Sequence, residues 1–441
     1  MKRRITIALA ALMIAALCAC GAAAEEEGLA ARATAVYEAL AAGDYAQVAA
    51  RFDETMAQML DEDALAQAMQ GVYAQLGAMT GAQVVQTDEA LCAAALLVAH
   101  ENGQSALQMT FDSEGRLSGM VLSPLPQSDA AQALSRELPE GAQASEVALF
   151  PGTARELGGE LIVPAGAGEE TVYVVFVHGS GPSDRDESVG ANKPFRDLAY
   201  DLAALGVGSL RFDKITYAAP GWQPMETIDD EYLQPVAEAL AVLRERTGAK
   251  RVYLVGHSEG AMLAPYLVEQ CGFDGGIALA GTPKQLWEIS WAQNVAMLDM
   301  LEGDAREVAQ AQLDAEAERA KTLADMSDEE AESATVFGVS AVYLRHMARM
   351  DQAQIAKDSG KPFLFLWGTA DVQVDFAAFT AWNERLGDGP FTYTVYPGLN
   401  HLFIPAQEGE NIMNVMEAYG VPSRVDERVA QDIASWIDAQ R

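Results

Sequence analysis

The chain has 441 residues, of which 29 are basic and 64 are acidic, and its formal net charge is −35. Half of the residues are hydrophobic, so a sizeable buried core is available, and the length suggests two or three folding units. A charge this negative argues against nucleic acid as a partner and against direct binding to an anionic membrane surface. The composition is typical of a globular protein with an acidic, solubilising surface.

The N-terminus has the pattern of an export signal. Three basic residues at positions 2–4 precede an apolar run from Ile5 to Leu17, which is shorter than the about 20 residues that span a bilayer. The stretch Leu17-Cys18-Ala19-Cys20 resembles a bacterial lipobox, which implies acylation of Cys20. We expect a lipoprotein-type signal peptide over 1–20 and a tether over 21–28. The protein would then be exported and held by a lipid anchor on the outer face of the cytoplasmic membrane; the alternative is a secreted protein cleaved nearby.

Outside the signal region the chain has two cysteines, Cys92 and Cys271. We expect two isolated thiols, although a disulfide stays open in an oxidising compartment. The sequence has no cluster of cysteines or histidines at metal-binding spacing and no glycine-rich phosphate loop. We therefore expect neither a metal nor another cofactor.

Residues 29–126 predict a small α+β domain. Apolar residues recur at helical spacing between about 29 and 79, and strand-like runs follow over 83–85, 91–99 and 105–111. This order resembles the accessory domain of nuclear transport factor 2-like type that precedes hydrolase domains in some bacterial exported proteins. The segment has no catalytic signature, so we expect a scaffold or binding element, followed by a polar connector over 127–145.

From 146 to 441 strands and helices alternate, which predicts an α/β fold with a mostly parallel sheet covered by helices on both faces. The expected strands lie at 171–177, 208–212, 251–255, 276–280, 362–367 and 391–396. Helical spacing without an internal proline interrupts this rhythm over about 283–361. We expect these helices to cap the C-terminal edge of the sheet and shape a substrate pocket. The alternative is a solvated, charged helical bundle remote from the site. This alternative suits the middle of the segment, Glu302 to Glu332, better than its two ends.

The sequence Gly256-His257-Ser258-Glu259-Gly260 follows an expected strand and precedes a helix-forming run. This is the context of a nucleophile elbow, in which glycines allow a sharp turn that lifts the serine hydroxyl above the sheet. Ser258 is therefore the candidate nucleophile. Pro265 in the following helix should kink it.

A serine needs a base, and the base needs an orienting acid. Five histidines are present, and the best placed is His401, on a loop after the strand 391–396. His178 is expected to order a loop, and the His257 side chain should point away from the nucleophile. Asp371 follows the strand 362–367 and is the candidate acid, with Asp375 as the fallback. The order Ser258, Asp371, His401 is that of α/β-hydrolases.

The oxyanion of the transition state needs two backbone N–H groups. We expect one from Glu259, which follows the nucleophile at a helix N-terminus, and the other from the loop after Val177. In that loop Ser180 is the first candidate and Gly181 the second.

From about Val147 onwards the chain resembles bacterial α/β-hydrolases of the esterase and dienelactone hydrolase-like group. Three stretches carry the resemblance to a subgroup of these esterases: 178–187, 192–197 and 211–214. It implies hydrolysis of short-chain carboxylic esters, as small-molecule substrates, without a cofactor. Asp184, Arg185 and Asp186 could line the site, but ion pairs that pin the loop are the preferred interpretation.

Two other functions stay open at this point. A serine peptidase of the prolyl oligopeptidase type shares the fold, although no propeller-like repeat precedes the hydrolase region. A lipid-anchored binding protein with an inactive hydrolase domain is the third possibility. The oligomeric state is not readable from the sequence.

Overall fold

The computed structural model describes residues 28–88, 92–101, 103–125, 137–218, 227–298 and 303–441. It divides the chain into two compact units, one formed by 1–133 with 419–422 and the other by 134–418 with 423–441. The expected signal peptide, with Cys20, lies outside the described residues. No helix in the described ranges is long and apolar enough to cross a membrane.

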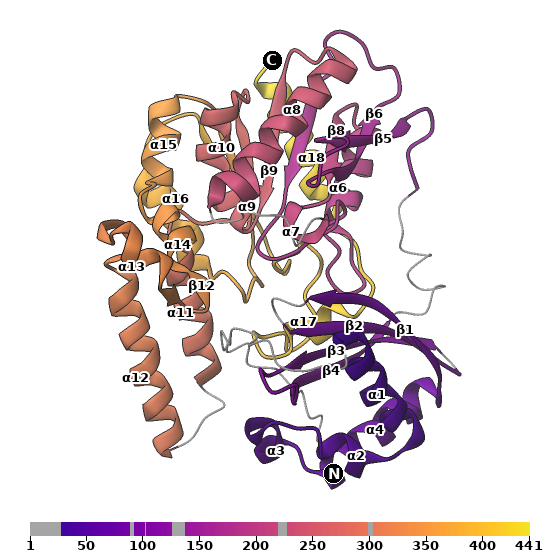
Figure 1. The fold of residues 1–441 in the computed structure, drawn as a ribbon. Helices are drawn as coiled ribbons and strands as arrows, with labels where there is room; N and C mark the ends of the chain where they lie inside the picture. Colours follow the sequence, from indigo (N-terminus) through magenta and orange to yellow (C-terminus); the bar gives the residue numbers. More distant parts are fainter. Residues whose placement is uncertain (1–27, 89–91, 102, 126–136, 219–226, 299–302) are drawn as a thin grey trace. The chain divides into compact units, whose positions relative to one another are not determined.

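The N-terminal unit combines helices with one antiparallel sheet (Figure 1). Strands β1 to β4 pair in sequence order, and the helices bury Val36 and Leu40 in the same core as Leu96, Val98 and Leu107 of the sheet. Aspartates at the N-caps of three helices accept backbone N–H groups with their side chains. The elements are α1 (Leu29–Ala42), α2 (Tyr45–Ala49), α3 (Glu54–Met59), α4 (Glu62–Leu76), β1 (Met79–Asp88), β2 (Ala93–His100), β3 (Gly103–Phe111) and β4 (Leu117–Leu125).

The second unit is built on an eight-stranded sheet of order β14-β13-β10-β9-β7-β8-β6-β5. The six strands from β14 to β8 pair in parallel, whereas β6 and β5 are antiparallel additions at one edge. The expected α/β fold with a mostly parallel sheet is thus confirmed. The strands are β5 (Gln143–Leu149), β6 (Leu157–Val163), β7 (Tyr173–Val177), β8 (Gly208–Phe212), β9 (Val252–His257), β10 (Gly276–Leu279), β13 (Phe363–Gly368) and β14 (Phe391–Tyr396).

Strand β5 begins inside the stretch that was expected to be a connector. Its first residues are polar and exposed because it is the edge strand, with only one neighbour and one face toward the core. The central strands β7, β8 and β9 are buried at every position, which is why they read as continuous apolar runs.

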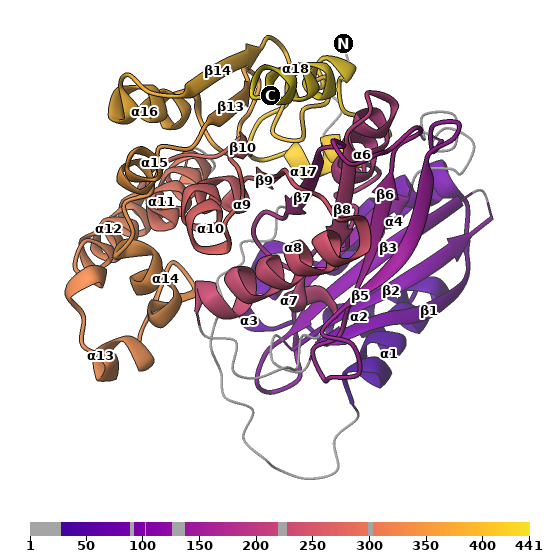
Figure 2. The same ribbon diagram turned by 90° about the horizontal axis from the view of Figure 1, so that it is seen from above.

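Helices cover both faces of this sheet (Figure 2). On one face α6 (Pro194–Ala204) packs against α18 (Glu427–Ala439), and on the other α8 (Gln234–Thr247) packs against α10 (Ala264–Cys271). The remaining elements of the unit outside the insertion are α7 (Ile215–Ala218), the π-helical turn Asp229–Leu233, α9 (Glu259–Met262), α16 (Phe376–Leu386) and α17 (Val415–Tyr419), of which the last residue is grouped with the first unit.

Pro265 breaks the helix that follows Ser258. Helix α9 ends at Met262 and α10 starts at Ala264, with the proline in its first turn. A proline there has no N–H to donate to the preceding turn, so the chain forms two short helices where the sequence predicted one kinked helix.

The segment between β10 and β13 is a helical insertion, as expected. Its own small core includes Leu323, Val336 and Leu344, and most of the described residues of α12 are exposed. The elements are α11 (Leu286–Met297), α12 (Gly303–Ala320), the 3-10 turn Leu323–Asp325, α13 (Asp328–Glu332), β11 (Thr335–Val336), β12 (Val339–Ser340), α14 (Ala341–Ala348) and α15 (Gln352–Ser359).

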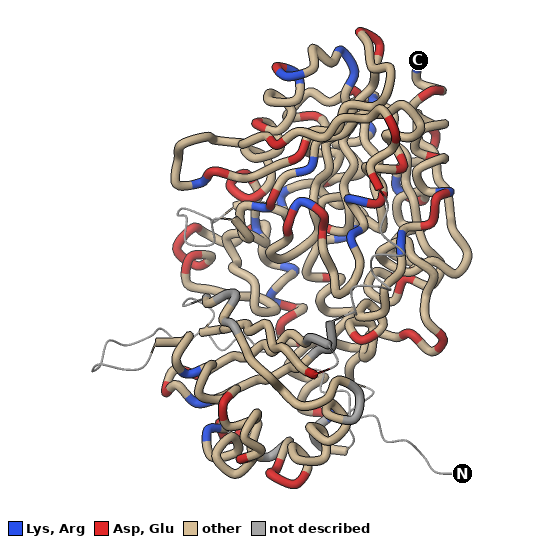
Figure 3. Tube along the Cα trace, turned by 90° about the vertical axis from the view of Figure 1, so that its right-hand side faces the viewer, with Lys and Arg blue, Asp and Glu red and all other residues tan. Residues whose placement is uncertain are grey.

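Acidic residues outnumber basic ones along the chain, and Figure 3 shows them spread over helices and loops of both units. Cys92 and Cys271 are half-buried and neither forms a disulfide. Burial raises the pKa of the Cys271 thiol to about 12, which makes it a poor nucleophile at neutral pH.

Candidate active site

Ser258 lies at the turn between β9 and α9, where its backbone adopts φ 52° and ψ −115°. Non-glycine residues rarely adopt a positive φ, and the strain is characteristic of functional sites. The flanking glycines are required by the same turn. A Cβ on Gly256 would lie 2.5 Å from the carbonyl carbon of Gly260, and a Cβ on Gly260 would lie 2.5 Å from the carbonyl oxygen of His178. The motif is therefore a steric necessity of the turn, which leaves Ser258 half-buried at the end of a central strand.

Asp371 and His401 come together after two neighbouring strands. Asp371 follows β13 and His401 follows β14, and these strands pair in parallel, so the loops at their carboxyl ends lie side by side. Nδ1 of His401 lies 2.7 Å from Oδ2 of Asp371. The other carboxylate oxygen accepts the N–H groups of Gln373 at 2.9 Å and Val374 at 3.0 Å. Since the carboxylate can only accept, Nδ1 carries the proton and Nε2 is left as a base.

The fallback acid has a different role. Asp375 is the N-cap of α16, where its carboxylate accepts the N–H of Ala378 at 2.7 Å. The hydrogen bond to His401 comes from Asp371.

The two histidines that the sequence disfavours as the base, His178 and His257, have the roles expected of them. His178 Nε2 lies 2.9 Å from the carbonyl oxygen of Asp184 and so orders the loop, and burial lowers the pKa of His178 to about 4, which keeps it neutral. His257 points into the protein, and its ring packs against that of His401 with centroids 4.7 Å apart. Among the described residues the Ser258 hydroxyl makes no hydrogen bond.

The loop after β7 lies directly against the nucleophile. A Cβ on Gly179 would come within 3.0 Å of the Ser258 Cβ. The Gly179 N–H is already used, since it donates to Glu187 at 2.8 Å. The next residues, Ser180 and Gly181, are exposed, and Gly181 has a φ of 80°. The backbone N–H groups on offer for an oxyanion are thus those of Ser180 and Gly181 on this side and that of Glu259 at the start of α9.

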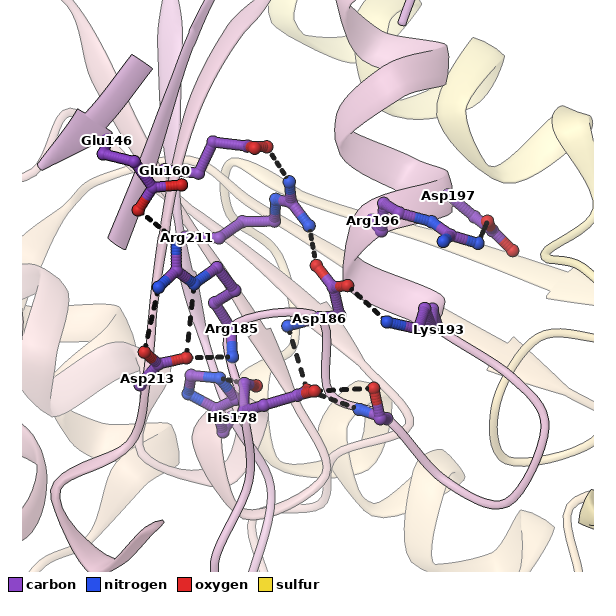
Figure 4. Close-up of polar contacts among 12 residues, drawn as sticks. Glu146, Glu160, His178, Arg185, Asp186, Lys193, Arg196, Asp197, Arg211 and Asp213 are labelled. Atoms are coloured by element: carbon purple, nitrogen blue, oxygen red, sulfur yellow. Dashed lines mark hydrogen bonds and ion pairs between the residues drawn. The ribbon is translucent and has the colours of Figure 1, made fainter. Parts of the chain in front are cut away.

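Ion pairs hold the far end of this loop (Figure 4). The Arg185 guanidinium contacts Glu146 at 2.6 Å and Asp213 at 3.1 Å. Asp186 pairs with Lys193 at 2.9 Å and with the buried Arg211, which also pairs with Glu160. Asp184 accepts N–H groups within the loop itself. These contacts support the preferred interpretation of the charged stretch 184–186, since each side chain pins the loop.

A buried polar cluster that the sequence reasoning missed surrounds the Glu259 side chain. The Glu259 carboxyl accepts hydrogen bonds from Tyr343 at 2.9 Å and Tyr232 at 3.0 Å, and it also contacts the Ser180 side chain. Lys214 Nζ lies 2.7 Å from both the Tyr232 hydroxyl and the Gly179 carbonyl oxygen.

Lys214 also pairs with Glu231 at 2.7 Å. Burial raises the pKa of Glu259, an effect that Lys214 opposes and Glu231 strengthens. Tyr343 belongs to α14, so the cluster links the helical insertion to both residues expected to supply oxyanion amides. The only signal for it in the sequence is a lysine two residues after a buried strand, in Arg211-Phe212-Asp213-Lys214.

Replacing Tyr343 tests this link. Tyr343→Phe keeps the ring but leaves one oxygen of a buried carboxyl without its donor, so we expect a loss of about 1 to 2 kcal/mol in the free energy of unfolding. Because α14 then loses its hydrogen bond to Glu259, the ratio of kcat/KM for octanoyl and acetyl esters should change as well. Tyr393→Phe is the matched control, since the buried Tyr393 hydroxyl has no hydrogen-bond partner among the described residues. An unchanged ratio and stability in Tyr343→Phe would contradict the link.

A serine at positive φ between a central strand and a helix, with an Asp–His pair after the next strands of the sheet, is the arrangement of the α/β-hydrolases. A family model described as "Alpha/beta hydrolase family" matches residues 174–411. Esterase EstD of Thermotoga maritima is 30% identical over 343 residues, which are 76% of this chain and 77% of that protein. The chain belongs to the α/β hydrolase family.

A second model, described as "Protein of unknown function (DUF3887)", matches residues 33–120, within the N-terminal unit. Among solved structures, an esterase of Pyrococcus furiosus, Pf2001, is 14% identical and covers 67% of this chain and 91% of its own, with a TM-score of 0.42. Est1E of Butyrivibrio proteoclasticus is 15% identical and covers 66% of this chain and 99% of its own, with a TM-score of 0.41.

Proposed function

We propose that the protein is a serine hydrolase that cleaves carboxylic esters through an acyl-enzyme, with Ser258 as nucleophile, His401 as base and Asp371 as the orienting acid. The observation that carries the proposal is the Asp371–His401 hydrogen bond of 2.7 Å, at the same sheet edge as a serine held at positive φ. The similarity to Esterase EstD supports the ester as the substrate class.

The proposed reaction has two halves. Ser258 Oγ attacks the ester carbonyl while its proton moves to Nε2 of His401, and the oxyanion accepts the N–H groups of Glu259 and of Ser180 or Gly181. The intermediate collapses, and the alcohol leaves with the proton from His401. His401 then takes a proton from water, the hydroxide attacks the acyl-enzyme, and the carboxylic acid is released as Ser258 regains its proton. The reaction needs no cofactor.

A substrate panel tests the substrate class. We expect the purified protein to hydrolyse p-nitrophenyl acetate and butyrate faster than the octanoate and laurate, because the sequence resemblance implies short acyl chains. Aminoacyl p-nitroanilides should stay intact. Cleavage of the anilides without cleavage of the esters would instead indicate a peptidase, and no turnover of either would favour a binding protein.

We also propose that the protein is exported and anchored through a lipid on Cys20, and that the N-terminal unit is an accessory domain of nuclear transport factor 2-like type. The basic residues at 2–4, the apolar run and Leu17-Cys18-Ala19-Cys20 support the anchor. The order of helices before an antiparallel sheet supports the domain type. Metabolic labelling with palmitate should mark the wild type and Cys18→Ser but not Cys20→Ser; equal labelling of Cys20→Ser would refute the anchor.

A further inference from the structure

Glu187 is a buried carboxylate beside the candidate site. Its side chain is about 5% exposed, and its backbone has a φ of 52°, a strained value for a non-glycine residue. Oε1 accepts the N–H of Gly179 at 2.8 Å and lies 3.0 Å from Nδ1 of His257. One oxygen thus contacts both the loop that carries Ser180 and the residue that precedes Ser258.

His257 continues the chain of contacts to the base. Its Nε2 lies 2.9 Å from the carbonyl oxygen of His401, which can only accept, so Nε2 carries a proton. Nδ1 lies 3.0 Å from Oε1 of Glu187, so a proton on Nδ1 would place opposite charges in contact. Burial alone would lower the pKa of His257, but Glu187 outweighs it and the pKa is raised. The same partner holds the pKa of Glu187 below its usual range despite burial. Both shifts favour the charged forms of these two side chains, which lie 3.0 Å apart.

Other groups face His257 and Glu187, but each of these two side chains remains the main partner of the other. From the loop after β13 the Asp371 carboxylate adds a smaller effect that also raises the pKa of His257. From the loop after β7, His178 is neutral at pH 7. From α6 the Phe195 ring meets the His257 ring edge-on at 6.4 Å. The His401 ring, from the loop after β14, is tilted by 54° relative to the His257 ring, with the ring centroids 4.7 Å apart.

We propose that Glu187 and His257 are positioning residues, a buried ion pair that sets the oxyanion loop and the His401 loop relative to Ser258. The pair contacts the backbone of Gly179 and of His401, and His257 adjoins Ser258 in sequence, so it connects the oxyanion loop and the His401 loop to the nucleophile. Because Gly179 lies directly against Ser258, a shift of the loop would change the distance between the oxyanion donors and the nucleophile. This inference rests on the proposed function.

Glu187→Gln tests the pair. The amide oxygen can still accept from Gly179, but the negative charge that favours a doubly protonated His257 is gone. We expect kcat for p-nitrophenyl acetate to fall about 100-fold with KM nearly unchanged, the effect of misplacing reacting groups by about 1 Å. The rate at which a fluorophosphonate labels Ser258 should fall by a similar factor. Counting labelled sites at the end of the reaction corrects both rates for any unfolded protein.

Asp197→Asn is the matched control. Asp197 is a buried carboxylate in α6 of the same unit, and it contacts Arg196 and the N–H of Val425. Its replacement should lower the melting temperature and leave kcat within about threefold of the wild type. A Glu187→Gln variant with wild-type kcat, or an equal loss of kcat in both variants, would show the pair to be structural only.

The pair also predicts a pH signature. His257 has a raised pKa, so its contribution to stability is complete below about pH 6.5 and is lost as the pH rises through its folded pKa; the Glu187 contribution is complete above about pH 4.5 and is lost in acid. The stability difference between wild type and Glu187→Gln should therefore be largest between these values. A constant difference across pH would contradict the assignment.

NMR of the wild type tests the same point without a variant. One histidine should still be an imidazolium at pH 6.5 and titrate above it; a spectrum in which no histidine does so would refute the charged pair.

If the wild type is labelled by fluorophosphonate yet hydrolyses no ester, the proposed substrate class fails while the labelling rates still test the pair. If the wild type is not labelled at all, both proposals fail.

Discussion

Replacing Ser258 with alanine should reduce kcat for p-nitrophenyl acetate by a factor on the order of 10⁶, because the acyl-enzyme can no longer form. The remaining rate would come from the backbone N–H groups of Glu259 and Ser180, which the substitution leaves in place. KM should change little, since the hydroxyl is small and makes no hydrogen bond among the described residues. Alanine at positive φ is as strained as serine, so the protein should stay folded.

Ser209→Ala is the control for this substitution. Ser209 is buried in β8, and its hydroxyl has no hydrogen-bond partner among the described residues, so losing it should leave kcat unchanged. The measurement compares the steady-state rates of Ser258→Ala and Ser209→Ala at equal protein concentration. A Ser258→Ala protein within tenfold of the wild type would mean that another residue is the nucleophile.

Asp371→Asn should lower kcat by a factor on the order of 10⁴. The N–H groups of Gln373 and Val374 donate to Oδ1, so an asparagine would place its carbonyl oxygen there and turn its NH₂ group toward His401. Nδ1 of His401 must then accept, which moves its proton to Nε2 and leaves no base for Ser258. The structure thus predicts the orientation of the asparagine amide. That orientation in turn favours the His401 tautomer with its proton on Nε2, which cannot act as the base.

Asp375→Asn provides the comparison. Asparagine caps helices about as well as aspartate, and Asp375 caps α16 without contacting His401, so this variant should keep the wild-type kcat. Rates across the neutral pH range for both variants would separate them. A similar loss in both would show that the carboxylates act on the loop's stability and not on the imidazole.

Much of the hydrolase unit follows from the sequence because its central strands are buried on both faces. A strand that is buried on both faces has no place for alternating polar residues, so runs such as Val172–Val177 are continuously apolar. The turn at Ser258 requires glycine on both sides. Asp371 and His401 are predicted from their places after two expected strands and from the chain order, and these strands pair in parallel, so both residues lie at the same edge of the sheet. The edge strand β5 was harder to predict because half of its residues face solvent.

The buried polar partners around the site could not be predicted from spacing. Glu187, Lys214 and Tyr343 come from three segments, and only the fold brings them toward Gly179 and Glu259. A buried polar residue leaves no periodic signal of its own. The resemblance drew attention to 178–187 and 211–214, but it did not indicate that Glu187 faces His257 or that Tyr343 of the insertion reaches Glu259.

The most direct test of the account is to map where a fluorophosphonate reacts. After incubation of the purified protein with the probe and proteolysis, mass spectrometry should find a single adduct, on Ser258, and none in Ser258→Ala. An adduct on a different residue, or labelling that survives Ser258→Ala, would contradict the assignment of the nucleophile and with it the proposed serine hydrolase mechanism.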